Sequence, residues 1–276
     1  MDILHHKLDK KASVLEEVNK TSGTFASGLP DTIVIHYTAG PSAESAINTL
    51  KEDGVPASAH VVVDLDGTLT QLVPFNKIAW HAGKSAWHER TGLNKYSIGI
   101  EIVNAGRLEK NGNVCRSWFG KTYPEEEFVR AVHRNESDPT WWHCFTEKQV
   151  ESVFELCKAI SKKYDIQHIL GHEEISPGRK IDPGPAFPLD KIRDRLLHND
   201  RKEDSDTPGE DVIGKGIVNA GSLNIRSGPG AAYDTIASPL SRNTEVFILD
   251  EQKDWCQVEV KMTGWVSGKF VKKVNS

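Results

Sequence analysis

The sequence predicts an α/β domain with a central mixed β-sheet and flanking helices, followed by a linker and a small all-β barrel. Patterns typical of strands and of helices alternate through residues 30–198, as expected for a sheet that carries helices. A polar stretch without periodicity follows at 199–211 and is predicted to be the linker. Short alternating runs separated by Gly and Pro turns then fill 212–276, which predicts the barrel. Residues 1–29 are predicted to form an N-terminal extension.

The first strand is predicted over residues 32–37, where Thr32-Ile33-Val34-Ile35-His36-Tyr37 is rich in β-branched side chains. Thr38-Ala39-Gly40-Pro41 ends it. The next apolar residues follow helical spacing, with Gly54 as a stop signal: Ala43, Ala46, Ile47 and Leu50. This region therefore predicts a strand, a loop and a helix.

Two apolar runs, 59–65 and 68–73, are joined by Asp66-Gly67, the dipeptide that best suits a two-residue hairpin turn. Residues 97–104 alternate, with three isoleucines on one face and Gly99, Glu101 and Val103 on the other. The sequence therefore predicts a hairpin and a half-buried strand.

Thr146 and Gln149 form a capping-box pattern at the start of the best-marked helix. Its apolar residues share one helical face: Val150, Val153, Phe154, Cys157, Ile160 and Tyr164. The long polar stretch before this helix, 105–145, is predicted to have little regular structure, and His133 and His143 within it are interpreted as surface residues. Long loops of this kind inside a domain are usually functional or mobile.

The composition is that of an ordinary globular protein, with 26% charged and 38% hydrophobic residues. A net charge of -5 without clustered Lys and Arg argues against nucleic acid as a partner. No run approaches the ~20 apolar residues that a membrane-spanning helix requires. Charges interrupt residues 1–10, so no classical export signal is predicted. The 4 cysteines show no C-x-x-C spacing and are interpreted as free thiols.

Titratable groups lie in turn-forming sequence at residues 171–184. The segment reads Gly171-His172-Glu173-Glu174-Ile175-Ser176-Pro177-Gly178-Arg179-Lys180-Ile181-Asp182-Pro183-Gly184. His172 and Asp182 can both ligate Zn²⁺, and a catalytic zinc commonly takes three protein ligands and leaves one position open. His36 is the candidate third ligand, because it lies at the end of the first strand on the face opposite the isoleucines. The pattern predicts a zinc site.

Glu101 is expected near His36 if their strands are neighbours, where it would take a proton from water attacking a carbonyl. Lys180 would stabilise the resulting oxyanion. Each residue also has an ordinary interpretation: a structural histidine, a solvated strand glutamate, or, for Lys180 beside Arg179, surface charge. Their joint occurrence favours a hydrolase.

Four ordered motifs between Pro30 and Leu197 strongly resemble the type 2 N-acetylmuramoyl-L-alanine amidases. That family includes the cytosolic muramyl-peptide recycling amidase, phage lysozyme-amidases and animal peptidoglycan recognition proteins. The motifs are Ile33-Val34-Ile35-His36-Tyr37-Thr38, Trp80-His81-Ala82-Gly83, Ser97-Ile98-Gly99-Ile100-Glu101, and Gly171-His172 through Asp182-Pro183-Gly184. The resemblance implies the fold of this family, a central mixed sheet with flanking helices.

The same resemblance implies site residues. It implies the zinc ligands His36, His172 and Asp182, a catalytic Glu101, and Lys180 as transition-state stabiliser; other branches of the family place a cysteine at the third ligand position and often use a tyrosine near the site.

The resemblance also implies a substrate groove. Trp80 and His81 look like part of this substrate-binding segment, with a core role for Trp80 as the alternative. His60 either lines the groove or is a buried structural histidine.

The C-terminal segment resembles bacterial SH3-like wall-binding modules through Leu223-Asn224-Ile225-Arg226-Ser227-Gly228-Pro229-Gly230 and Gly264-Trp265-Val266. The aromatic residues Tyr233, Trp255 and Trp265 lie near these turns in the sequence. They form either a shallow stacking surface for sugars or peptides, or the filling of a small core.

The expected function is zinc-dependent hydrolysis of the amide that joins N-acetylmuramic acid to L-alanine, with the barrel binding the cell wall. The alternatives are a non-catalytic peptidoglycan-binding protein and a zinc peptidase that acts on stem peptides. Peptidoglycan or muramyl peptides are the expected partners, and a monomer is favoured. We expect synthesis in the cytoplasm; phage-style release, a dedicated secretion machine and cytosolic recycling all fit.

Overall fold

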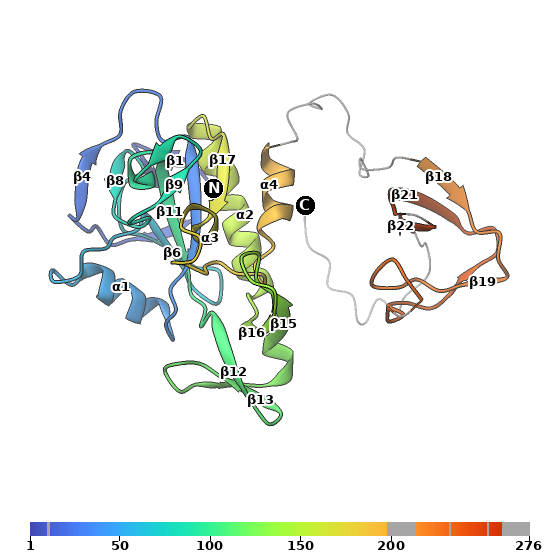
Figure 1. The fold of residues 1–276 in the computed structure, drawn as a ribbon. Helices are drawn as coiled ribbons and strands as arrows, with labels where there is room; N and C mark the ends of the chain where they lie inside the picture. The colour runs from blue at the N-terminus through green and yellow to red at the C-terminus, as the bar shows by residue number, and fades with distance from the viewer. Residues whose placement is uncertain (10–11, 198–213, 232, 253, 261–276) are drawn as a thin grey trace, which may run out of the picture. The chain divides into compact units, whose positions relative to one another are not determined.

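The chain divides into two compact units, residues 1–202 and 203–276 (Figure 1). The residues that the computed structural model describes are 1–9, 12–197, 214–231, 233–252 and 254–260. The predicted linker at 199–211 and the segment 264–266 lie outside the described residues. The predicted domain boundaries therefore stay predictions.

A mixed six-stranded sheet forms the centre of the first unit, as the sequence predicted. From one edge to the other its strands are β17 (His168–Gly171), β5 (Thr32–Tyr37), β11 (Ser97–Ile102), β6 (Val61–Val63), β7 (Leu69–Gln71) and β3 (Ser13–Leu15). The four strands from β17 to β6 run parallel to their neighbours. The hairpin β6–β7 is antiparallel, as Asp66-Gly67 predicted, and Gly67 has a φ of +85° in its turn.

The strand β11 lies inside the sheet between β5 and β6, which hydrogen-bond to both of its edges. The sequence predicted a half-buried strand, and this was wrong. Ser97 and Gly99 are buried as fully as Ile98 and Ile100, because the alternate residues face a second layer of the protein instead of water.

Helices α2 (Glu147–Lys163) and α4 (Leu189–Leu197) cover the isoleucine face of the sheet. The other helical segments are α1 (Ala43–Lys51), η1 (Leu93–Lys95), η2 (Glu125–Glu127) and α3 (His172–Ile175). The predicted capping box starts α2: Gln149 N donates to Thr146 Oγ1 at 3.1 Å, and Thr146 N donates to Gln149 Oε1 at 3.1 Å. Helices α2 and α4 lie side by side (Figure 1), and their apolar faces share one core with the isoleucines of β5 and β11.

Three separate two-stranded sheets also belong to the first unit: β1 (Ile3–Leu4) with β2 (Lys7–Leu8), β4 (Thr21–Thr24) with β8 (Lys77–Ala79), and β9 (Ala86–Trp87) with β10 (Arg90–Thr91). The N-terminal segment is part of this fold. Its strand β3 runs parallel to β7 and forms one edge of the central sheet, and β4 pairs with β8.

The region 105–145, called the insert below, folds into a five-stranded antiparallel sheet, so the prediction of little regular structure was wrong. Its strands, in spatial order, are β14 (Thr122–Tyr123), β13 (Val114–Arg116), β12 (Arg107–Asn111), β16 (Pro139–His143) and β15 (Phe128–Val132). In Figure 1, β12 and β13 project away from the central sheet. A small separate core supports this sheet: Ala105, Leu108, Cys115, Tyr123 and Phe128.

The two histidines of the insert are interior residues, and their interpretation as surface residues was wrong. His133 is 1% exposed and His143 is 8% exposed. His133 stacks on the ring of Trp142, while His143 packs against Tyr123. The sequence around His133 gave no sign of its burial, because Arg134, Asn135 and Glu136 next to it are exposed.

The described part of the second unit is built from short strands, as predicted. They are β18 (Gly214–Ile217), β19 (Ser222–Leu223), β20 (Leu240–Ser241), β21 (Glu245–Gln252) and β22 (Trp255–Glu259). β21 pairs with β18 and β22, and β19 pairs with β20, all antiparallel. Val218, Leu240 and Val246 form a small core.

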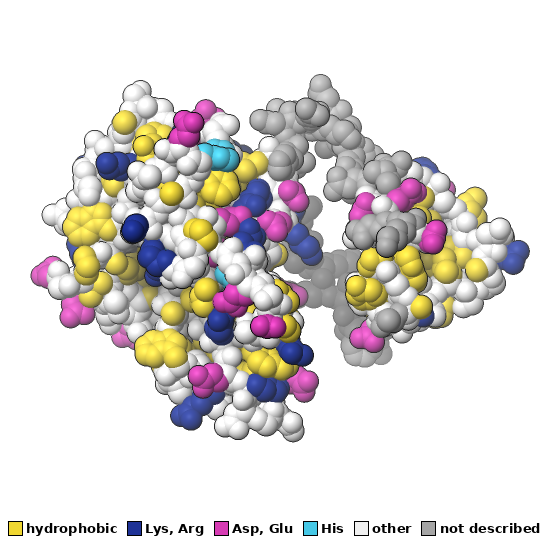
Figure 2. Space-filling model, in the orientation of Figure 1, with side chains coloured by type: hydrophobic (Ala, Val, Ile, Leu, Met, Phe, Trp, Pro, Cys, Tyr) yellow, Lys and Arg dark blue, Asp and Glu magenta, His cyan; other side chains and the backbone are white. Residues whose placement is uncertain are grey.

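The surface carries both signs of charge. On the face that Figure 2 shows, Lys and Arg side chains are interspersed with Asp and Glu on each unit. Among the described residues, no helix combines the length and the apolar character that crossing a lipid bilayer demands.

Candidate active site

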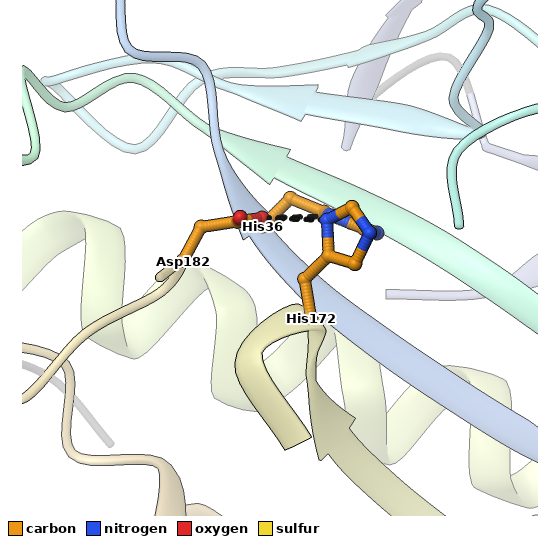
Figure 3. Close-up of side chains that lie close together, drawn as sticks. All are labelled: His36, His172 and Asp182. Atoms are coloured by element: carbon orange, nitrogen blue, oxygen red, sulfur yellow. Dashed lines mark hydrogen bonds and ion pairs between the residues drawn. The ribbon is translucent and has the colours of Figure 1, made fainter. Parts of the chain in front are cut away.

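Three separate segments of the first unit bring His36, His172 and Asp182 together (Figure 3). His36 is near the carboxyl end of β5. His172 is the first residue of α3, directly after the neighbouring parallel strand β17, and Asp182 follows in the loop after α3. Because the carboxyl ends of parallel strands meet at one edge of a sheet, the fold brings the two histidines to the same place.

The potential ligand atoms of these residues lie in mutual contact. His36 Nδ1 is 2.9 Å from His172 Nδ1 and 3.0 Å from Asp182 Oδ2. His172 Nδ1 is 3.0 Å from the same carboxylate oxygen. All three residues are buried, with exposures of 1% for His36, 3% for His172 and 7% for Asp182. These are the three residues that the sequence proposed as zinc ligands.

A chain of hydrogen bonds determines which nitrogen of His36 carries the hydrogen and which carries the lone pair. His81 Nε2 lies 3.2 Å from the carbonyl oxygen of Ser97, which can only accept, so this nitrogen carries a hydrogen. The Ser97 hydroxyl does not donate to it, since it donates to the carbonyl of Leu93 at 2.6 Å. In the neutral ring His81 Nδ1 is then an acceptor, and it receives a hydrogen bond from His36 Nε2 at 2.9 Å. The lone pair of His36 is therefore on Nδ1.

His172 has the same orientation for a similar reason. Its Nε2 lies 3.1 Å from the carbonyl oxygen of Ala82, to which it donates. Arg179 Nη2 also approaches this nitrogen at 3.2 Å, but it has nearer acceptors in Ser176 Oγ at 2.7 Å and the carbonyl of Lys84 at 2.8 Å. The lone pair of His172 is thus also on Nδ1.

Two imidazole lone pairs and one carboxylate consequently meet at a single point, an arrangement that can hold a metal ion. Burial, and then the nearby His172, lower the pKa of His36 to about 4, so its ring favours the neutral form that binds metals. Burial raises the pKa of Asp182, but contacts with His172 and His36 outweigh it, and the pKa lies below its ordinary range. Two imidazole nitrogens and one carboxylate oxygen suit a zinc ion, so the donor set fits that metal.

Glu101 stands beside this cluster, opposite His36 in the parallel register of β11 and β5. Its Oε2 is buried and has no hydrogen-bond partner among the described residues. Burial, and then the charge of Asp182, raise the pKa of Glu101 to about 8, while the ammonium of Lys180 acts to lower it. Lys180 also acts to lower the pKa of His36, so its charge lies close to the cluster.

The contact between His81 and His36 is the main feature that sequence reasoning missed. The ring of His81 lies over Gly99 of β11, where an added Cβ would be 2.3 Å from its Cγ. A glycine within a strand of isoleucines was the available signal, because such a glycine often marks a close approach.

The two other proposed substrate-binding residues, His60 and Trp80, differ from each other in burial. His60 is fully buried: Gly99 N donates to its Nδ1 at 3.0 Å, and its Nε2 donates to the carbonyl of Lys77 at 2.9 Å. This agrees with the structural alternative. Trp80 is partly exposed and its Nε1 donates to Ser22 Oγ at 2.7 Å. The roles of His60, Trp80 and His81 in substrate binding stay predictions.

Comparison with known proteins identifies the family of the first unit. Residues 26–185 match the family model described as N-acetylmuramoyl-L-alanine amidase. The chain belongs to this family. The resemblance inferred from its four motifs is thereby confirmed, and the amidase region contains every residue of the cluster.

Two curated relatives are amidases of Escherichia coli strain K12. N-acetylmuramoyl-L-alanine amidase AmiD is 33% identical over 58% of this chain and 51% of its own length. 1,6-anhydro-N-acetylmuramyl-L-alanine amidase AmpD is 31% identical over 49% of this chain and 56% of its own length. The chain therefore spans about half the length of these relatives.

A solved structure resembles the fold of the amidase region, and a second family model matches the C-terminal segment. The crystal structure of a selenomethionine AmpD derivative is similar with a TM-score of 0.52 and 23% identity, over 70% of this chain and 98% of that one. This likeness shows a shared fold. Residues 221–272 match the bacterial SH3 domain model, which confirms the resemblance of the C-terminal segment to such domains.

Proposed function

We propose that this chain is a zinc-dependent amidase that hydrolyses the bond between N-acetylmuramic acid and L-alanine in peptidoglycan. The observation that carries the proposal is the convergence of His36, His172 and Asp182 beside the buried Oε2 of Glu101, which has no hydrogen-bond partner among the described residues. Family membership supports the reaction class. The names of the curated relatives, which are muramoyl-alanine amidases, support the bond that is cut.

The three ligands of the proposed zinc site are His36 Nδ1, His172 Nδ1 and an oxygen of Asp182. Three protein ligands are typical of catalytic zinc, which keeps a further position for water or substrate. When bound there, zinc would polarise the amide carbonyl and lower the pKa of a water molecule. His81 and the carbonyl of Ala82 hold the two rings in the tautomers that metal binding requires.

Glu101 would accept the proton of the attacking water and pass it to the leaving amine. A pKa of about 8 lies near the working pH range, which suits a group that both takes and gives a proton, and a nearby cation would favour its carboxylate form. Lys180 would stabilise the negative charge that develops on the amide oxygen.

We further propose that the second unit binds the wall and that intact peptidoglycan is the preferred substrate. The bacterial SH3 domain match supports this, because a module that binds polymer would be of little use on small soluble fragments. The exposed ring of Tyr233, which covers Gly228, is a candidate contact for sugars or peptides.

The decisive experiment is mass analysis of purified peptidoglycan after digestion by the full-length protein. Free lactyl groups on muramic acid, together with released stem peptides that begin with L-alanine, are expected. Peptides cut internally would instead indicate a zinc peptidase, and unchanged material would indicate a non-catalytic binding protein. Either of these results would contradict the proposal.

The zinc requirement is tested separately by chelation. Removal of metal should abolish hydrolysis, and stoichiometric zinc should restore it. The His172→Ala variant should bind less zinc than the unaltered protein and should not recover activity when zinc is added. An active protein without metal would contradict the proposed chemistry.

A further inference from the structure

The insert contacts the segment that carries two of the three proposed zinc ligands. The turn between β15 and β16 packs against α3, and His133 Nε2 is 2.8 Å from Glu173 Oε2. The two side chains are only 1% and 3% exposed. Arg134 Nε lies 2.9 Å from the other carboxylate oxygen, Oε1. Both oxygens of this buried carboxylate thus have partners from the insert.

Residues 172–184, which carry His172 and Asp182, are called the ligand loop below. Glu173 bonds to both ends of this loop. It follows His172 directly in the chain, and its backbone N–H donates to the carbonyl of Asp182 at 2.8 Å. Its Oε2 also accepts a hydrogen bond from the backbone N–H of Gly184 at 3.0 Å. One residue therefore connects the helix start that presents His172 with the turn that presents Asp182.

Further contacts join the insert to Glu173 and to Gly184 of the ligand loop. Asn135 Nδ2 donates to the carbonyl of Glu173 at 3.0 Å. Trp142 stacks on His133 with an interplanar angle of 19°, and it also packs closely on Gly184, where an added Cβ would be 2.7 Å from Trp142 Cζ3. The insert thus fits the ligand loop through polar contacts and through close packing.

We propose that residues 133–135 of the insert act as a positioning clamp for His172 and Asp182, through Glu173, and so set the metal affinity of the site. This inference rests on the proposed zinc site. None of the clamp residues is proposed as a ligand. They act by holding the loop in the geometry in which the Nδ1 and Oδ2 atoms meet, and outer partners of metal ligands commonly change metal affinity by about 10–100-fold.

Removal of His133 would leave the buried Glu173 carboxylate short of one partner. A buried charge that loses its partner is strongly destabilised, so the loop would rearrange to solvate it. Because Glu173 bonds to both ends of the loop, this rearrangement would separate His172 from Asp182. The expected effect is therefore on metal binding first and on catalysis only as a consequence.

The test compares zinc affinity in full-length variants by competition with a chromophoric chelator. His133→Ala should weaken zinc binding by about 10–100-fold. His133→Gln retains a donor near the position of Nε2 and should restore most of the affinity. The visible spectrum of the cobalt-substituted protein should shift in His133→Ala and return in His133→Gln, because it reports ligand geometry.

His143→Ala is the matched control. His143 is also a buried histidine of the insert, but its Nδ1 accepts a hydrogen bond from Ala105 N at 3.2 Å, within the insert. This variant should lower thermal stability without weakening zinc binding. If His133→Ala does not fold, Asn135→Ala, which removes only the bond to the Glu173 carbonyl, should still weaken zinc binding several-fold.

The outcomes separate the clamp from the proposed function. Unaltered zinc affinity in His133→Ala, or an equal loss in His133→Ala and His143→Ala, would overturn the clamp while the unaltered protein still binds zinc and cuts its amide. A full-length protein that binds no zinc would overturn the zinc site itself, and the clamp with it.

Discussion

Glu101 and His36 are direct partners in the parallel pairing of β11 with β5, so the proposed base and the first proposed metal ligand are on adjacent strands. The hydrogen bonds of the sheet fix their Cα positions. The placement of these two residues consequently depends on the rigid centre of the fold, whereas Asp182 lies in a loop; a fixed position is what a general base needs.

Glu101→Gln should abolish turnover without removing the metal. Glutamine has nearly the same shape but cannot accept a proton from water, so kcat should fall by about 10²–10⁴-fold. Zinc content, measured by elemental analysis, should equal that of the unaltered protein. Glu109→Gln, an exposed change on β12, is the control and should retain activity. Normal turnover in Glu101→Gln would show that the base has been misassigned.

Gly99→Ala should displace His81 and thereby weaken metal binding. The new Cβ would lie 2.3 Å from His81 Cγ, so the ring must move and lose its hydrogen bond to His36. We expect a loss of about 1–3 kcal/mol in the free energy of unfolding and roughly tenfold weaker zinc binding. Thermal denaturation and chelator competition measure the two effects.

Gly54→Ala is the control for this variant, since a Cβ there meets no atom within 4 Å. It should alter neither stability nor zinc affinity by a measurable amount. Zinc binding that is unchanged in Gly99→Ala would refute the role of His81 in holding His36.

The metal-free protein should lose stability in acid through His60. Burial lowers the pKa of His60 from 6.5 to about 4 in the folded protein. Between these values the unfolded chain binds a proton that the folded protein does not, so the free energy of unfolding decreases as the pH falls from 6.5 to 4. The loss attributable to this residue is about 3 kcal/mol at pH 4. Urea denaturation at a series of pH values measures it.

The His60→Gln variant tests the assignment. It should be less stable at neutral pH, because the bonds to Gly99 and Lys77 are disturbed, but its stability should change less between pH 6.5 and 4. An unaltered slope in this variant would show that other groups dominate acid unfolding.

Tyr233→Ala should reduce retention of the full-length protein on insoluble peptidoglycan. The ring is 49% exposed and packs over Gly228, so its removal takes away a flat apolar surface without opening the small core. Co-sedimentation with purified wall should show weaker binding. Ile217→Ala, which removes a side chain that is 68% exposed in the same unit, should bind as before. Equal retention of both variants would argue against Tyr233 as a wall contact.

The sequence predicted those elements whose periodicity is local. The β-branched run of β5, the alternating residues of β11, the hairpin turn at Asp66-Gly67 and the capping box at Thr146 are each visible within a few residues, and the structure contains these strands, the hairpin and the cap. The proposed metal ligands were predictable for a different reason. They lie in motifs that resemble an amidase family, and residues 26–185 match the model of that family.

The insert was not predictable in this way, because its contacts join residues far apart in the sequence. Lys110 lies over the rings of Phe128 and Trp141, so a lysine that reads as a solvated charge covers apolar surface. The pairing of His133 with Glu173, 40 residues away, leaves no local pattern. Interior polar contacts of this type are specified by tertiary structure alone.

The pairing of Glu173 with the turn of the insert limits how far this protein can be shortened by engineering. A truncated version without residues 105–145 would expose an interior anion beside the ligand loop, so deletion alone is expected to yield a weakly metallated protein. A compact redesign would have to supply a new cationic or amide donor at Glu173, or replace this residue with an uncharged one that still accepts a hydrogen bond from Gly184.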